Sequence, residues 1–229
     1  MGCGDSRDHG EEEDYLKSLE MALGFASHNV RHLDLYIRKY ASEDDMNSNQ
    51  YRLIGQKLNL NLSNTSGTRS AEIYFSNLLY YQGKYSRTLL LILAIMHGSG
   101  QASDRARLLF EVFDRELIGR VSVGDVSTLV STMTQISLEQ VDILINYELL
   151  EKKPAAQLRE YLRKVTSVST KAEKELKKRL FADDNSLTLA AMLRAIKDPG
   201  NARLLTTSGI RSLALEIYRS KEEPDKASK

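Results

Sequence analysis

The 229-residue sequence has one cysteine, Cys3, three prolines and no tryptophan. A single cysteine excludes an intrachain disulfide and any zinc site built from several cysteines. The first proline is Pro154, so nothing in residues 1–153 removes a backbone N–H from a helix. The longest apolar run, residues 89–96, is less than half of the roughly 20 residues that cross a bilayer. No apolar segment near the start resembles a secretory signal. We therefore expect a cytoplasmic protein.

The charge is almost balanced, because 32 Lys and Arg face 31 Asp and Glu, which leaves a formal charge of +1. A dedicated nucleic-acid-binding protein normally has a marked basic excess, so we expect no nucleic-acid partner. The basic run at residues 171–179 also contains Glu173 and Glu175, a pattern typical of a solvated helix face. No nucleophile lies in a recognisable catalytic turn, so the sequence predicts no catalytic residue and no enzyme.

The first six residues, Met-Gly-Cys-Gly-Asp-Ser, match the pattern for N-myristoylation of Gly2. Cys3 lies beside it, where a palmitoyl chain could be added. One myristoyl chain binds a membrane only marginally, whereas two acyl chains anchor a protein stably. Acidic residues 11–14 follow instead of a basic run, and an anionic leaflet would repel them. The sequence thus predicts a lipoprotein that is peripheral on a membrane, and the alternative is an unmodified polar tail.

Apolar residues recur at helical spacing along most of the chain, and no useful stretch alternates with a period of two. This pattern predicts an all-α fold. Segments with this helical or apolar pattern are residues 15–23, 30–40, 51–62, 71–81, 86–97, 104–113, 125–134, 138–150, 154–165, 170–181, 187–196 and 208–219.

One loop carries a recognisable pattern. A helix with two phenylalanines ends at Asp114, and Gly119, Val121 and Asp125 occupy positions 6, 8 and 12 of a twelve-residue segment that starts there. This segment resembles an EF-hand loop. In such a loop the first carboxylate opens the cation site and the glycine permits the sharp turn. The residue at position 8 pairs with a second loop in a short β-bridge, and the last acid closes the site.

The candidate Ca²⁺ ligands are Asp114, Glu116, the carbonyl of Arg120, Ser122 and Asp125. Calcium takes about six to eight oxygens, and this set approaches that number only with added waters. Ile118, at position 5, contributes no side-chain oxygen, and Asp125 is shorter than the usual glutamate. Two possibilities stay open, a weak Ca²⁺ site and a loop that keeps its shape with little or no metal.

Residues 87–114 are similar to the middle of neuronal calcium sensors and calcineurin-B-like proteins, which also begin Met-Gly and are often myristoylated. The resemblance implies EF-hand-like helix pairs with degenerate loops and extra helices. A second loop would start near Leu78, with Gly83 and Tyr85 at positions 6 and 8 and no acids. A fourth would lie near residues 181–188, with Leu187 in the bridge, and residues 42–49 would be the remnant of a first. The implied divisions are a flexible acylated tail (1–14), an N-terminal half (15–100), a C-terminal half (101–220) and a charged tail (221–229).

The resemblance implies a membrane-anchored calcium sensor or adaptor that binds a partner's helix in an apolar groove. Helical stripes of this kind also form ordinary cores, so packing inside the protein is the alternative for the same residues. An alternative function is a structural protein of a cytoskeletal or ciliary assembly, with a metal-free EF-hand fold. The groove candidates are Leu89, Leu90, Ile92, Leu93, Met96, Leu129, Val130 and Met133.

Overall fold

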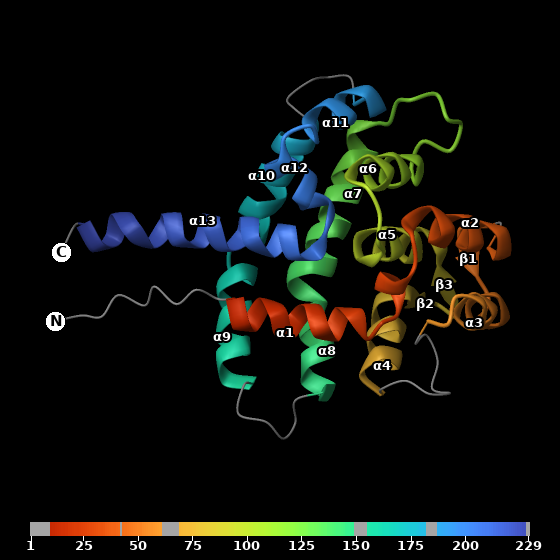
Figure 1. The fold of residues 1–229 in the computed structure, drawn as a ribbon, viewed down its shortest axis with the longest axis horizontal. Helices are drawn as coiled ribbons and strands as arrows, with labels where there is room; N and C mark the ends of the chain where they lie inside the picture. Colours follow the sequence, from red (N-terminus) through yellow and green to blue (C-terminus); the bar gives the residue numbers. More distant parts are fainter. Residues whose placement is uncertain (1–9, 42, 61–68, 149–154, 182–186, 228–229) are drawn as a thin grey trace.

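The computed structural model describes residues 10–41, 43–60, 69–148, 155–181 and 187–227, and these residues are mostly helical (Figure 1). Within them, no helix is both long enough and apolar enough to span a bilayer. The α-helices are α1 (Gly10–Met21), α2 (Val30–Tyr40), α3 (Ser48–Lys57), α4 (Arg69–Leu79), α5 (Arg87–His97), α6 (Ala102–Glu111), α7 (Val123–Thr134), α8 (Val141–Glu148), α9 (Ala155–Thr166), α10 (Ser169–Phe181), α11 (Leu189–Ala195), α12 (Pro199–Ala202) and α13 (Thr207–Ala227).

A small antiparallel sheet is formed by the segments that connect α2 to α3 and α4 to α5. It consists of β1 (Asp45–Met46), β2 (Tyr80–Tyr81) and β3 (Lys84–Ser86), in the order β1-β3-β2. Gln82 and Gly83 connect β2 to β3 with φ angles of 48° and 85°, which suit the tight turn of a two-residue hairpin. Met46 lies opposite Tyr85, so the segment between α2 and α3 is paired with the segment between α4 and α5.

A second backbone pairing joins the segment between α6 and α7 to the start of α11. The Val121 N–H donates to the Leu187 carbonyl at 3.0 Å, and the Leu189 N–H donates to the Gly119 carbonyl at 3.2 Å. Between α7 and α10 the chain inserts a π-helical turn, η2 (Gln135–Glu139), followed by α8 and α9. These two helices lie side by side below α7 and α10 in Figure 1.

Helix α5 lies at the centre of the molecule. Ser86 caps its start by accepting a hydrogen bond from the Leu89 N–H at 3.2 Å, and every residue from Leu90 to Met96 is buried. The helix packs against α2, α4, α6 and α7. Buried side chains therefore continue from the N-terminal half into the C-terminal half.

The ends of several helices differ from the sequence prediction. Helix α1 begins at Gly10, inside the segment predicted as a flexible tail, and α13 extends past residue 219 to Ala227. The helix expected over residues 138–150 follows the π-helical turn η2, which begins three residues earlier. Hydroxyl groups within this stretch bond backward to the helix: Ser137 donates to the Met133 carbonyl at 2.7 Å. Such back-bonding bends helices, and it favours the irregular turn.

The start of α13 depends on one close approach. At Gly209 the helix lies against the 3₁₀ turn η3 (Arg203–Leu205), and a Cβ atom there would come within 1.9 Å of the Arg203 carbonyl oxygen. A side chain of any size would push the two segments apart. Gly209 therefore allows α13 to lie close to η3. Arg211, two residues later in α13, is buried in the core.

Candidate functional site

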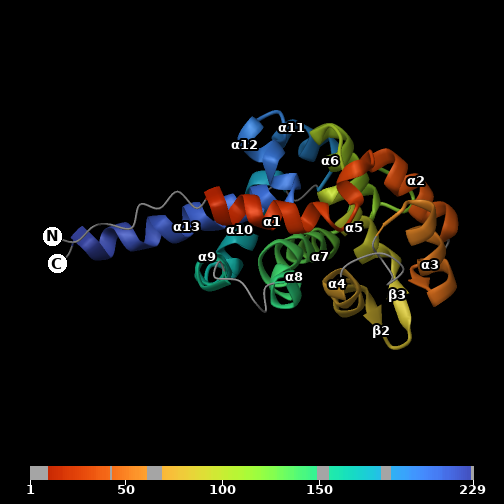
Figure 2. The same ribbon diagram turned by 60° about the horizontal axis from the view of Figure 1, so that its bottom comes forward.

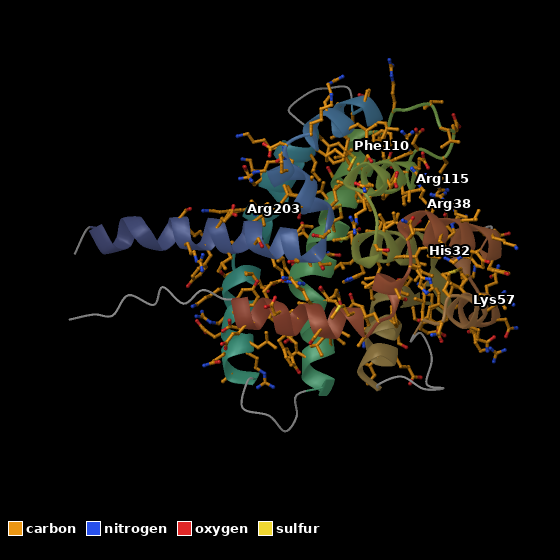
Figure 3. The ribbon with its side chains drawn as sticks, viewed as in Figure 1. His32, Arg38, Lys57, Phe110, Arg115 and Arg203 are labelled. Atoms are coloured by element: carbon orange, nitrogen blue, oxygen red, sulfur yellow. The ribbon has the colours of Figure 1, made fainter. Side chains whose placement is uncertain are left out.

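The loop that resembles an EF-hand lies between α6 and α7, after the buried Phe110 that Figure 3 labels. Asp114 is buried, and its carboxylate bonds to the backbone of its own loop. One oxygen, Oδ1, accepts from the Ile118 N–H at 3.0 Å, and Oδ2 accepts from the Gly119 N–H at 2.7 Å. Leu117 and Gly119 both have positive φ angles, 54° and 74°. The chain thus turns around the carboxylate, as it would around an ion.

Two other predicted ligands cap the following helix. The Ser122 hydroxyl oxygen accepts from the Asp125 N–H at 3.0 Å. In return, Oδ2 of Asp125 accepts from the Ser122 N–H at 3.1 Å and from the Ser122 hydroxyl at 2.6 Å. This reciprocal arrangement satisfies N–H groups that a helix start leaves unpaired. The Ser122 hydroxyl and Oδ2 of Asp125 are thereby bonded to each other in the cap of α7.

The remaining predicted ligands lie at the surface. Glu116 and Arg120 are exposed, and Arg120 takes part in the backbone bridge opposite Thr188. Across the described residues, no three His, Cys, Asp or Glu side chains gather in an arrangement that could hold a metal ion. The loop instead presents three large apolar side chains to solvent. Leu117, Ile118 and Val123 are 70%, 65% and 58% exposed.

An ion cluster joins this loop to the segment between α2 and α3. Asp44 lies between two arginines: one carboxylate oxygen contacts Arg87 at 2.7 Å and the other contacts Arg115 at 2.5 Å. Arg87 also donates to the Ala41 carbonyl at 3.0 Å. The carboxylate of Asp44 therefore links the segment between α2 and α3 to the loop between α6 and α7. Figure 3 shows the basic side chains it labels along this side of the molecule, Arg115, Arg38, His32 and Lys57.

The predicted groove is not an open surface. Of its eight residues, Leu89 is half-buried and lines a surface depression of about 420 Å³ together with Leu78 and Lys84. The other seven side chains belong to the core, so the structure places them inside the protein, as the alternative interpretation allows. Amphipathic spacing identifies the face that is buried, but it does not say whether a partner or the chain itself covers that face. The seven buried residues are Leu90, Ile92, Leu93, Met96, Leu129, Val130 and Met133.

Gly2 and Cys3, the predicted acylation sites, lie outside the described residues. The helix that follows them, α1, is held by a buried arginine of α13. Arg211 is completely inaccessible to solvent. It donates to both oxygens of Glu13, from Nε at 2.9 Å and from Nη2 at 2.8 Å. It also donates to both oxygens of Glu20, from Nη1 at 2.6 Å and from Nη2 at 3.0 Å.

Neighbouring side chains complete this network. The Tyr161 hydroxyl of α9 donates to Glu13 at 2.9 Å, and the Thr207 hydroxyl of α13 donates to Glu20 at 3.0 Å. Burial by itself would raise the pKa of Glu20, but Arg211 outweighs it and holds the pKa below its ordinary value. Burial likewise would lower the pKa of Arg211, yet the two glutamates raise it. Arg211 and Glu20 thus stabilise each other's charged forms, and the network ties α1 to α9 and α13.

His97 lies near this network, at the end of α5. Its Nε2 is buried and has no hydrogen-bond partner among the described residues, and its ring stacks on Phe25 with 6.3 Å between centroids. Burial lowers the pKa of His97, and the positive charge of Arg211 acts in the same direction, while Glu20 opposes them. The surroundings of His97 therefore favour the neutral imidazole.

Sequence reasoning missed this network, although a signal for it exists. Glu13 and Glu20 share one helical face with the buried Leu16, at spacings of three and four residues. Arg211 likewise falls on the buried face of α13, one turn before Ala214. When one apolar helix face carries an acid and another carries a base, the two charged residues are candidates for a buried ion pair. No family model matches the chain, and no curated protein and no solved structure matches it significantly.

Proposed function

We propose that this chain is a non-enzymatic, membrane-anchored adaptor of EF-hand type, in which Ca²⁺ binding is weak or lost. The observation that supports this most is the pairing of its connections two by two. Met46 pairs with Tyr85 in the small sheet, and Val121 pairs with Leu187 across the second bridge. Four helix–connection–helix units joined in this manner are the arrangement expected of two EF-hand pairs. Helices α8 and α9 are then an insertion between the third and the fourth unit.

In this proposal the loop between α6 and α7, the third of the four EF-hand-like loops, has a structural role. Both oxygens of Asp114 already accept backbone N–H groups, and Ser122 and Asp125 are occupied in capping α7. An ion would have to share these oxygens with the hydrogen bonds that they already accept. The expected result is a dissociation constant for Ca²⁺ in the millimolar range or weaker, comparable with the weakest calcium modules.

We place the partner-binding surface at the tip of this loop rather than in the predicted groove. Leu117, Ile118 and Val123 are exposed within seven residues of one another. Large apolar side chains that gather on a surface mark interaction sites in soluble proteins. Seven of the eight side chains predicted to line a groove are already packed in the core, so a partner helix could reach those seven only by opening the core.

Calorimetric titration with Ca²⁺ and with Mg²⁺ tests the metal part of the proposal. We expect little or no heat at micromolar Ca²⁺ in the wild type, in Asp114→Ala and in the matched control Asp45→Ala. Asp45 is an exposed acid whose removal leaves the third loop intact. Micromolar Ca²⁺ binding that Asp114→Ala abolishes and Asp45→Ala retains would make the protein a sensor and contradict an adaptor that works without metal.

The intact mass of the native protein tests the anchor, because acyl chains on Gly2 and Cys3 add to the mass directly. We expect Gly2→Ala to lose these additions and to leave the membrane fraction. An unchanged distribution of Gly2→Ala would instead favour the alternative, a structural protein of a cytoskeletal or ciliary assembly.

A further inference from the structure

Helix α10 presents a stripe of lysines to solvent. Lys171, Lys174 and Lys178 are spaced three and four residues apart, so they lie on one face of the helix, and all three are exposed. None of them forms an ion pair or a side-chain hydrogen bond with a described residue. Among the described side chains, the lysine stripe therefore has no hydrogen-bonded counter-charge.

A groove between α10 and α13 continues the stripe. It has a volume of about 510 Å³, and Leu213 and Ile217 contribute apolar surface to it. Its charged lining consists of three cations and two acids, and each acid is bonded to an arginine. Glu175 pairs with Arg179 at 2.8 Å and Glu216 pairs with Arg203 at 2.9 Å. The remaining cations of the lining, Lys171 and Lys221, are left without a described counter-charge.

This basic region lies at the end of the molecule where α1 begins. Helix α13 packs against both α9 and α10, and α1 begins beside α9, where Tyr161 bonds to Glu13. Figures 1 and 2 both show α13 leaving the body on the side where α1 starts. Gly2 precedes Gly10 by eight residues, a chain length that reaches at most about 28 Å. An acyl chain on Gly2 would therefore enter a membrane close to this region.

We infer that the lysine stripe and the α10–α13 groove form a docking surface for an anionic lipid membrane. Lysine ammonium groups act as compact point charges, which suits attraction to a layer of phosphate and carboxylate headgroups. The inference rests on the proposed function for the position of the membrane, but it requires no acyl chain. It also supplies the electrostatic attachment that the N-terminal sequence lacks, since residues 11–14 are acidic.

A membrane fits this surface better than a nucleic acid does. No aromatic side chain lines the groove or belongs to the stripe, so nothing there can stack on an unpaired base. The net charge of the whole chain is only +1, so the surfaces away from this region are acidic in sum and would repel a long polyanion.

Sedimentation of the full, non-acylated chain with lipid vesicles tests the inference. Vesicles of phosphatidylcholine alone are compared with vesicles that also contain phosphatidylserine. Binding is expected only to the second kind, and it should weaken as salt is raised. Each lysine near an anionic surface contributes about a fivefold gain in partitioning, so the triple variant Lys171→Glu, Lys174→Glu, Lys178→Glu should lose at least about 100-fold.

A matched control carries the same change of charge on the opposite side of the body, in α2 and α3. The triple variant Lys39→Glu, Arg52→Glu, Lys57→Glu alters three exposed cations and should retain binding. Circular dichroism tests whether both variants are folded. If the charge reversal in α10 unfolds the chain, the three lysines are replaced by glutamine instead of glutamate.

Three results would overturn the inference. They are the absence of binding to phosphatidylserine vesicles, an equal loss in both triple variants, and a loss of single-stranded RNA binding in the α10 variant while vesicle binding is unchanged. A native mass without acyl groups would refute the proposed anchor alone, because the vesicle assay uses the non-acylated chain.

Discussion

Arg211 and Glu20 are 191 residues apart in the sequence, and two hydrogen bonds of 2.6 and 3.0 Å join them inside the core. Glu13, which lies about two turns before Glu20 on the same face of α1, accepts hydrogen bonds from the same guanidinium group. Planar guanidinium is suited to such paired contacts, because its five N–H donors match the geometry of carboxylate oxygens. The first helix of the protein is therefore held by charge as well as by apolar contacts.

Replacing Arg211 by methionine should be strongly destabilising. The substitution keeps a long apolar stem but leaves Glu13 and Glu20 without their counter-charge, and breaking a buried ion pair in this way costs about 3–5 kcal/mol. Urea unfolding followed by circular dichroism measures the change. In the control Arg203→Met, which removes an exposed pair with Glu216, the loss should stay below about 1 kcal/mol. Equal losses in the two variants would contradict a special role for Arg211.

The free energy of unfolding should fall in two steps as the pH is lowered. Burial lowers the pKa of His97 in the folded state, so its contribution is complete above the ordinary value of 6.5 and declines below it. The pKa of Glu20 is also lowered, with Arg211 overcoming burial, so its contribution is present above 4.5 and is lost as the pH falls further.

The variant His97→Phe separates these two steps. Its ring can still stack on Phe25 but cannot take up a proton, so the step that begins near pH 6.5 should disappear. A single titrating group changes the unfolding free energy by at most about 1.4 kcal/mol per pH unit. Chemical unfolding at a series of pH values measures both steps, and an unchanged slope between pH 6.5 and 5 in His97→Phe would refute the assignment to His97.

Two glycines should respond in opposite ways to alanine. Gly209→Ala places a methyl group against the Arg203 carbonyl, and we expect a loss of at least about 3 kcal/mol or a failure to fold. Gly124 lies in the first turn of α7 with only ordinary contacts around its Cβ position. Gly124→Ala should stabilise the protein by about 0.5–1 kcal/mol, because alanine loses less backbone entropy in a helix. Thermal unfolding of the two variants compares them directly.

Removing the carboxylate of Asp114 should destabilise the protein equally with and without calcium. The Ile118 and Gly119 N–H groups lose their acceptor, which costs about 1–3 kcal/mol when such groups are shielded from water. Unfolding of Asp114→Ala and of wild type, each in EDTA and in Ca²⁺, measures the effect. If the wild type alone became markedly more stable in Ca²⁺, the third loop would be a metal site.

Local pattern is sufficient to locate most of the helices. The segment predicted at residues 154–165 is α9 (Ala155–Thr166), and the segment predicted at 170–181 is α10 (Ser169–Phe181). Both predictions are confirmed, because the helical period repeats within a few turns. A backbone hydrogen bond also joins Val121 to Leu187, whereas the EF-hand pairing from which a bridge at Leu187 is expected stays a prediction.

Relationships across the whole chain are not visible in such a pattern. The groove candidates have the spacing of a buried face, and that spacing is identical whether a partner or the protein's own helices cover it. The bond between Glu13 and Arg211 spans 198 residues, and no local periodicity connects two such positions. The lysines of α10, which have no ion-pair partner among the described residues, also have the sequence pattern of an ordinary solvated face, and only the fold places α13 beside them.

The pairing of the first helix with the last has a consequence for synthesis. Glu13 leaves the ribosome 198 residues before Arg211, a delay on the order of 10–40 s at translation rates of about 5–20 residues per second. Until Arg211 emerges, two glutamates that end up inside the core have no cation to receive them, so α1 cannot dock. The helix that is synthesised first among those described is therefore one of the last to reach its final packing.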